Sequence, residues 1–408
     1  MTARMRISAW RFVATFGVVS LLADVVYEGA RSVTGPILAV LGASAVVVGV
    51  VTGIGEASAL LLRLVAGPLA DRTRRFWAWT IAGYVLTVIS VPLLGFAQTV
   101  LLASVLIIME RVGKAIRSPA KDALLSFATA ATGRGKGFAV HEALDQIGAV
   151  VGPLLVAAVL ALTGDDYRPS LGILVVPGVA AIVLLLWLRS RAPRPELFEG
   201  NAHPERPEGS EPKPADGFRL PGAFWVYSGF GALTMTGFAT FGLISFHIVE
   251  QGILPAPWVP VVYAGVMLVD AVVALATGWL YDRIGPAALV VLPPVCAVLP
   301  ALAFGGAVIA VLIGAVLWGA ALGIQESTLR ATIADLVPPS HRATAYGLFA
   351  AALGIAAALG GALAGWLYST SLVAFVVTTA AIQALALAVL LPFLIRNRSR
   401  RKSAALNA

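Results

Sequence analysis

Charged residues are scarce in this chain, and their scarcity limits the class of protein that it can be. Asp, Glu, Lys and Arg together make up 12% of the 408 residues, whereas 59% are hydrophobic. A soluble domain carries about 25% charged residues, so this chain cannot cover a folded surface with polar side chains. Apolar runs of roughly 20 residues, the length that crosses a bilayer, recur along its whole length. We therefore predict a membrane protein with helical spans, because a helix satisfies its own backbone hydrogen bonds.

Cysteines and catalytic motifs are also scarce. The single cysteine, Cys296, excludes an internal disulfide and a cysteine metal cluster. The sequence contains no H-E-x-x-H zinc-protease motif, no G-x-S-x-G and no G-x-x-x-x-G-K-[ST] nucleotide loop. We therefore expect no enzymatic activity, no cofactor and no drive by ATP from this chain.

The surplus of basic residues, which gives a net charge of +8, does not indicate a nucleic-acid partner. Basic residues cluster in alternate loops between the apolar runs, which is the pattern that orients a membrane protein in its bilayer. With a cytoplasmic N-terminus, most of them face the cytoplasm, including Arg117 at the end of the fourth run, and Arg168 stands alone in an opposite-side loop. We predict a multi-pass protein of the inner cell membrane with both termini in the cytoplasm.

Twelve apolar stretches are predicted to form membrane-spanning helices. The first six cover residues 12–35, 44–69, 77–97, 99–117, 137–162 and 170–188. The second six cover residues 222–247, 258–280, 287–305, 307–328, 342–367 and 371–394. The segment between the two sets is rich in Pro, Glu and Gly and cannot cross a membrane. The predicted organisation is an N-terminal six-helix bundle over 1–189, a cytoplasmic linker over 190–220, and a C-terminal six-helix bundle with a basic tail over 221–408.

Sequence marks repeat between the two halves at nearly constant offsets. Residues 67–72 follow the second helix with the pattern Gly-x-x-x-Asp-Arg, and residues 278–283 repeat it after the eighth helix, an offset of 211. Gly152 and Gly360, inside the fifth helix of each half, are separated by 208 positions. A duplicated six-helix unit is a common way to build a secondary transporter whose substrate binds between the halves.

These features resemble the major facilitator superfamily over residues 10–395. The family signature is a Gly-x-x-x-Asp-Arg-x-Gly-Arg-Arg loop between helices 2 and 3, and residues 67–75 follow it except that Arg74 stands where the second glycine belongs. The second copy keeps that glycine as Gly285 but lacks the basic residues after it. Residues 148–153 of helix 5 are similar to the end of the signature of proton-coupled drug exporters. In helix 4, Arg111 stands where the family has a proton-transfer arginine, with Lys114 and Ala115 in place of Gln-Gly.

The resemblance implies an all-α membrane protein with the major facilitator fold, in which twelve transmembrane helices form two six-helix pseudo-symmetric bundles. It also implies a secondary active transporter that moves a small organic solute by alternating access, with protons as coupling ion, and we expect a monomer. Proton-coupled export is the first expectation. The alternatives are proton-coupled uptake of a metabolite or ion, or a membrane-embedded receptor or enzyme.

Ionisable side chains within the predicted spans are the first candidate functional residues. Each costs at least about 2.5–3.5 kcal/mol to place in the bilayer, and in the resembled family helices 1 and 4 line the central cavity. The alternative is that these charges form permanent ion pairs that only fix helix packing. The candidate proton-coupling and cavity residues are Asp24, Glu28, Arg31, Glu56, Glu110 and Arg111.

The repeated loops are the second candidate. The resemblance implies that Asp71 caps the N-terminal end of helix 11 and that Arg72 pairs with an acid at the end of helix 4, for which Asp122 is the obvious choice. The alternative is that the basic residues only set topology. The candidate residues of this conformational latch are Gly67, Asp71, Arg72, Arg75, Asp122, Asp282 and Arg283.

Helix 5 carries the third group of candidates. His141, Glu142 and Asp145 lack the second histidine of H-E-x-x-H, so we expect no metal and interpret them as a polar seam between helices. A proton relay is the alternative. Small residues allow close helix approach, so the candidate helix-packing positions are Gly148, Gly152 and Pro153.

Overall fold

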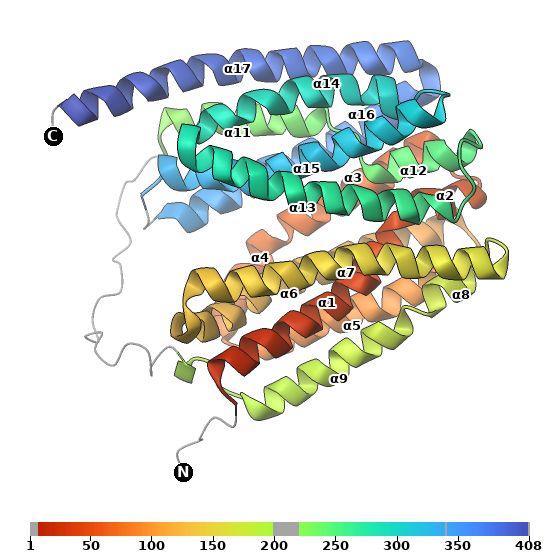
Figure 1. The fold of residues 1–408 in the computed structure, drawn as a ribbon, viewed down its shortest axis with the longest axis horizontal. Helices are drawn as coiled ribbons and strands as arrows, with labels where there is room; N and C mark the ends of the chain where they lie inside the picture. The colour runs from red at the N-terminus through yellow and green to blue at the C-terminus, as the bar shows by residue number, and fades with distance from the viewer. Residues whose placement is uncertain (1–6, 199–219, 339–340, 407–408) are drawn as a thin grey trace. The chain divides into compact units, whose positions relative to one another are not determined.

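The computed structural model describes residues 7–198, 220–338 and 341–406. These residues are almost entirely helical, and no strand occurs in these three ranges (Figure 1). Most of the predicted linker, residues 199–219, lies outside the described residues, as do residues 1–6 at the N-terminus.

The helices of the N-terminal half follow the predicted spans, with breaks inside three of them, including one at Val33 in the first predicted span. They are α1 (Ala9–Ser32), α2 (Thr34–Val40), α3 (Ala45–Leu61), α4 (Arg63–Thr73), α5 (Phe76–Leu94), α6 (Val100–Thr132), α7 (Arg134–Thr163), α8 (Tyr167–Gly172) and α9 (Val175–Arg191). The second predicted span is divided into α3 and α4 at Leu62, and the sixth into α8 and α9. The α6 helix is 33 residues long and continues well beyond its predicted end at residue 117.

The helices of the C-terminal half are likewise interrupted in places. They are α11 (Gly222–Thr236), α12 (Phe241–Glu250), α13 (Trp258–Ile284), the 3-10 helix η1 (Gly285–Val291), α14 (Leu292–Ala303), α15 (Val308–Leu336), α16 (Arg342–Thr370) and α17 (Leu372–Leu406). The seventh predicted span is interrupted between α11 and α12, where the side chain of Thr240 caps α12 by accepting from the Leu243 amide.

Ten helical segments in the described part of the chain are long and apolar enough to cross a membrane. Two differences separate them from the twelve predicted spans. The α6 helix carries four charged residues within its first 18 positions, too many for a uniformly apolar span. The eighth and ninth predicted spans fall in one helical segment, Trp258–Ala303, of 46 residues, although the chain reverses direction between α13 and α14 (Figure 1). The number twelve therefore stays a prediction.

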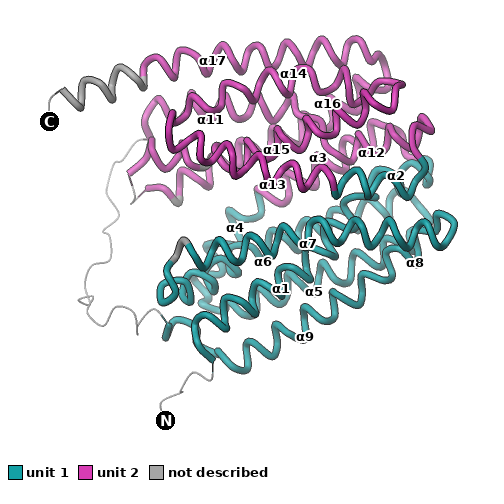
Figure 2. The backbone as a smooth tube through the Cα atoms, in the orientation of Figure 1, with its two compact units in different colours: residues 1–42, 61–211, 255–264 teal, residues 43–60, 212–254, 265–408 magenta. Residues whose placement is uncertain are grey.

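The chain divides into two compact units (Figure 2). Unit 1 comprises residues 1–42, 61–211 and 255–264, and unit 2 comprises residues 43–60, 212–254 and 265–408. Nearly all of α3 therefore groups with the C-terminal helices, and the first turns of α13 group with the N-terminal helices. The core of unit 1 at one end is built on α1, where Phe12 and Phe16 pack against Trp77 of α5.

Close helix approaches in both units occur at glycines. In unit 1, a Cβ on Gly152 of α7 would lie 2.8 Å from the Cα atom of Val25 in α1. In unit 2, a Cβ on Gly360 of α16 would lie 2.8 Å from the Cα atom of Thr236 in α11. The two pairs are related by the same offsets, 211 and 208, that relate the repeated sequence marks. The duplication visible in the sequence is thus also visible in the helix packing.

Glycines also bring α3 onto α16 within unit 2. A Cβ on Gly49 would lie 3.0 Å from the Cα atom of Gly365, and one on Gly361 would lie 2.9 Å from the Cα atom of Gly53. These contacts are backbone to backbone, so no side chain could move aside to make room. Close backbone approach of this kind explains why nearly all of α3 belongs to unit 2.

Candidate functional site

Four of the six charged residues of α6 lie on one face of the helix. Glu110, Lys114, Arg117 and Lys121 are spaced by four, three and four positions, which places their side chains in a single stripe. The α1 helix packs nearby and carries the acidic residues of the predicted coupling site. Glu110 is only 6% exposed and Arg117 only 4% exposed. A charge so deeply buried is stable only if the surrounding structure compensates it.

Three carboxylates of α1 and α6, of which Glu28 and Glu110 are buried and Asp24 is half-buried, each have a guanidinium within ion-pair distance. The pairs, with the distances between the nearest charged atoms, are Asp24–Arg117 at 3.8 Å, Glu28–Arg31 at 3.7 Å and Glu110–Arg111 at 3.4 Å. All three distances exceed that of a close charge-assisted hydrogen bond, about 2.7–2.9 Å. These contacts are therefore ion pairs without a close hydrogen bond between the charged atoms.

The structure gives each predicted coupling residue a specific partner. Arg111, at the position of the family's proton-transfer arginine, forms its ion pair with Glu110 and donates a hydrogen bond to the hydroxyl of Tyr27. The guanidinium that faces Asp24 belongs to Arg117.

The assignment of Arg117 to a cytoplasmic loop is wrong. The residue is buried within α6, where it also donates a hydrogen bond of 3.1 Å to Thr87 and lies 4.6 Å from the ring centre of Tyr84. A signal for this placement was present in the sequence, since Arg117 continues the helical stripe that Glu110 and Lys114 begin.

Two tyrosines contact the charged cluster, and sequence reasoning singled out neither of them. Tyr27 of α1 is 1% exposed, and the guanidinium of Arg111 lies 4.9 Å from its ring centre while the ammonium of Lys114 lies 3.8 Å from it. Tyr263, in the part of α13 that belongs to unit 1, donates a 2.5 Å hydrogen bond to the carboxylate of Glu28. A tyrosine in an apolar helix carries no charge, so nothing in the sequence separated these two from packing residues.

A small pocket adjoins the cluster within unit 1. It is lined by Arg31, Thr34, Ser90 and Glu110 together with apolar residues of α1, α5 and α6. One carboxylate oxygen of Glu110 faces Arg111, and the other has no hydrogen-bond partner among the described residues. Glu110 therefore keeps one buried carboxylate oxygen without a hydrogen bond from the described residues.

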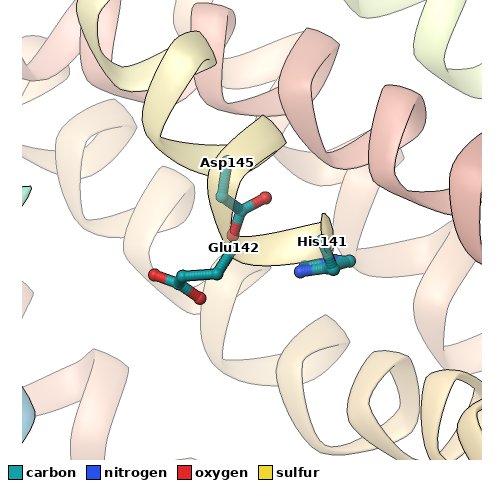
Figure 3. Close-up of side chains that lie close together, drawn as sticks. All are labelled: His141, Glu142 and Asp145. Carbon is teal, nitrogen blue, oxygen red and sulfur yellow. The ribbon is translucent and has the colours of Figure 1, made fainter. Parts of the chain in front are cut away.

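Two polar residues of α7, His141 and Asp145, contact side chains of other helices, and Figure 3 shows how they lie with Glu142. Nε2 of His141 lies 2.8 Å from the hydroxyl of Ser20 in α1, and Asp145 forms an ion pair of 3.7 Å with Lys121 of α6. His141, Glu142 and Asp145 each have one atom that could bind a metal ion, and these three atoms lie within 4.8 Å of one another. However, the side chains of His141 and Glu142 extend to opposite sides in Figure 3. We therefore continue to interpret this group as a polar seam joining α7 to its neighbours.

The first copy of the repeated loop forms its turn without the glycine of the family signature. Arg74 ends α4 in the left-handed conformation, with φ +50°, and Gly285 has φ +63° three residues after the aspartate of the second copy. A left-handed backbone at this point is thus common to both copies, and an arginine adopts it in one of them at a steric cost.

The remaining latch residues are mostly at the surface of their units. Asp71, Arg72 and Arg75 are exposed. Arg72 and Asp122 both lie in the described part of the chain and form no ion pair with each other. In the second copy, Asp282 and Arg283 are exposed, and the guanidinium of Arg283 lies 3.5 Å from the ring centre of Trp279.

The other predicted positions lie within helices. Gly67 of α4 faces Pro119 of α6 at ordinary van der Waals distance. Glu56 is half-buried in α3. Gly148 and Pro153 are buried on α7, where a Cβ on Gly148 would lie 3.0 Å from Cβ of Asp24.

Comparison with known proteins agrees with the fold and the repeated loops. The sequence profile described as Major Facilitator Superfamily matches residues 19–312 and again 258–408. The chain is 60% identical over 390 residues to a Mycobacterium tuberculosis protein described as uncharacterized, covering 94% of this chain and 93% of that one. It is 25% identical over 361 residues to an MFS-type transporter of Methanocaldococcus jannaschii, covering 87% of this chain and 88% of that one.

Solved structures with a similar fold are also transporters. The structure of the nucleoside transporter NupG superposes with a TM-score of 0.73 at 12% identity, covering 94% of this chain and 99% of the other. A peptide transporter bound to sulfate superposes with a TM-score of 0.70 at 16% identity, covering 95% and 94%. The chain therefore belongs to the Major Facilitator Superfamily, and the prediction of an all-α membrane protein with this fold is confirmed. The family and the fold indicate a secondary transporter of small molecules.

Proposed function

We propose that this chain exports a small organic solute across the cytoplasmic membrane by alternating access, in exchange for protons. The observation that carries the proposal is the set of buried, loosely paired carboxylates on α1 and α6. Protonation of a carboxylate at 3.4–3.8 Å from a guanidinium removes the attraction between them. The guanidinium then needs another anionic or polar partner, so proton binding and solute binding can be linked through the same arginine.

Asp24 and Glu28 are the proposed proton carriers, and they sit in different surroundings. Asp24 faces Arg117, whereas Glu28 faces Arg31 and accepts from Tyr263. Because Tyr263 lies on α13 and Glu28 on α1, protonation of Glu28 would weaken a bond between a helix of the N-terminal half and one of the C-terminal half. A bond of this kind is where protonation can bias the exchange between conformations.

The proposal is tested with the purified full-length protein in liposomes. A panel of solutes is screened for movement driven by an imposed pH gradient, and proton flux is followed with a pH-sensitive dye. We expect solute and protons to move in opposite directions, and both fluxes to be lost in Asp24→Asn or Glu28→Gln. Movement in the same direction would identify proton-coupled uptake instead. Solute flux that does not depend on the pH gradient would refute proton coupling.

The orientation is part of the proposal and is tested separately. Single cysteines replace the exposed residues Asp165, in the loop between α7 and α8, and Glu196, after α9, in a variant without the native cysteine. A membrane-impermeant thiol reagent added to intact cells should label position 165 and not position 196. Labelling of position 196 alone, or of both positions, would contradict cytoplasmic termini.

A further inference from the structure

One half-buried cation of the cluster, Lys114, has no carboxylate within ion-pair distance in the described part of the chain. Arg31, Arg111, Arg117 and Lys121 each lie within 3.8 Å of a carboxylate oxygen. Lys114 lies in the middle of the same helical stripe, yet no carboxylate in the described ranges approaches its ammonium to within ion-pair distance. Its ammonium lies instead over the ring of Tyr27, 3.8 Å from the ring centre.

The aromatic ring compensates this charge only in part. The interaction free energy of a cation over the face of a tyrosine is smaller than the hydration free energy that an ammonium loses when it leaves water. The guanidinium of Arg111 contacts the same ring at 4.9 Å, so the two cations lie within roughly 9 Å of each other, the sum of the two ring distances. Because Arg111 already forms an ion pair with Glu110, Lys114 is the cation at this ring that an incoming anion would pair with.

A hydrogen-bond donor is also available at this point. The hydroxyl oxygen of Tyr27 accepts a hydrogen bond from Arg111, and a phenol can accept and donate at the same time. No described residue accepts the hydrogen of the Tyr27 hydroxyl, although Tyr27 is almost completely buried. The ammonium of Lys114, which has no carboxylate within ion-pair distance, and the hydroxyl of Tyr27, whose hydrogen has no acceptor among the described residues, therefore belong to the same ring contact.

We propose that Lys114 and the hydroxyl of Tyr27 bind an anionic oxygen group of the transported solute, a carboxylate or a phosphate. The inference rests on the proposed function for the statement that this ligand is transported. When the site is occupied, the anion forms the close ion pair that Lys114 does not have with any carboxylate of the described residues. Arg111, which contacts the same ring, adds a second positive charge beside the ligand. Neutral and cationic solutes do not satisfy this site.

Binding is tested on the purified full-length protein by its melting temperature in detergent. The probes are sodium benzoate and sodium phosphate, with benzamide as the neutral match for benzoate, each titrated to saturation. Wild type is compared with Lys114→Gln and Lys114→Arg. The matched control is Lys121→Gln, because Lys121 lies on the same helical face but is paired with Asp145. Phosphate stabilises many proteins non-specifically, so the difference between wild type and Lys114→Gln is the quantity measured.

We expect benzoate or phosphate to raise the melting temperature of wild type in a saturable way, and benzamide to leave it unchanged. Lys114→Gln should weaken the apparent affinity about 10- to 100-fold, the factor for loss of one hydrogen bond to a charged group. Lys114→Arg should keep most of the affinity, and Lys121→Gln should keep it within a few-fold. A response to benzoate or phosphate alone tells which anionic group the site takes. The proposal is overturned if neither anion acts saturably, if Lys114→Gln responds like wild type, or if benzamide acts like benzoate.

A second measurement separates this inference from the proposed function. The same variants are assayed in liposomes for movement of solute along a pH gradient. Anion binding that depends on Lys114, without any proton-driven flux, would uphold the anion site and refute proton-coupled export. Proton-driven flux of a neutral solute that persists in Lys114→Gln would uphold the transporter and refute the anion site.

Discussion

The pair formed by Asp24 and Arg117 allows the coupling role to be separated from a purely structural role. Arg117 is almost completely buried and has three partners, which are Asp24 at 3.8 Å, the hydroxyl of Thr87 at 3.1 Å and the ring of Tyr84 at 4.6 Å. Removing one member of a buried ion pair costs about 3–5 kcal/mol because the other charge is stranded. At a separation of 3.8 Å, we expect the cost of Arg117→Gln to fall at the lower end, about 3 kcal/mol.

The opposite single substitution should cost less. Asp24→Asn leaves Arg117 with its hydrogen bond to Thr87 and its contact with Tyr84, so the guanidinium keeps two of its three partners. We expect a loss of about 1–2 kcal/mol, which is near the cost of one hydrogen bond to a charged group. The double variant, Asp24→Asn with Arg117→Gln, strands no charge and should recover much of the stability lost in Arg117→Gln.

The assay measures both stability and transport for the three variants. Stability is followed by the melting temperature in detergent, with Asp122→Asn as the control, because Asp122 is an exposed carboxylate on the same helix. Transport is followed as proton-driven flux in liposomes. If Asp24 carries the coupling proton, the double variant is stable but transports nothing along a pH gradient. Recovery of both properties would refute the coupling role. Unchanged melting temperatures in both single variants would refute the ion pair itself.

Three further predictions concern packing, the loop turn and the latch. Gly152→Ala should destabilise the protein by about 1–3 kcal/mol in the melting assay, because the added methyl group would lie 2.8 Å from a backbone carbon of α1. The control Gly229→Ala, with open space around the added methyl group, should be neutral or slightly stabilising. Arg74→Gly should raise the melting temperature, by an amount corresponding to about 1 kcal/mol, because it relieves a left-handed arginine at φ +50°; an unchanged or lower value would contradict strain at this turn. Asp71→Asn should reduce liposome transport more than Asp282→Asn, because the first loop has the richer set of basic neighbours; normal transport by an Asp71→Asn protein that reaches the membrane would leave the loop with a topological role only.

The amino-acid sequence by itself was sufficient for the class of fold. Long apolar runs with few charges predict spanning helices whatever their neighbours are, because the cost of placing a polar backbone in lipid is local to each segment. The repeated Gly-x-x-x-Asp-Arg loops and the paired glycines at Gly152 and Gly360 predict a duplicated unit, because a constant offset is visible without a structure. The stripe that Glu110 begins also predicts a charged helix face, and it could have placed Arg117 in that face rather than in a loop.

The partners of each charge were decided only by the tertiary structure. The sequence identifies Asp24 and Arg111 as candidates but does not say which charges pair. Pairing depends on how far each helix is rotated and shifted along its axis, which no local pattern specifies. In the structure, Arg117 pairs with Asp24, and Glu28 accepts a hydrogen bond from Tyr263. Lys114 contacts the ring of Tyr27 and has no carboxylate within ion-pair distance among the described residues. Hydropathy predicts that a helix is buried, whereas which polar atoms meet inside it depends on contacts between residues that lie far apart in the chain.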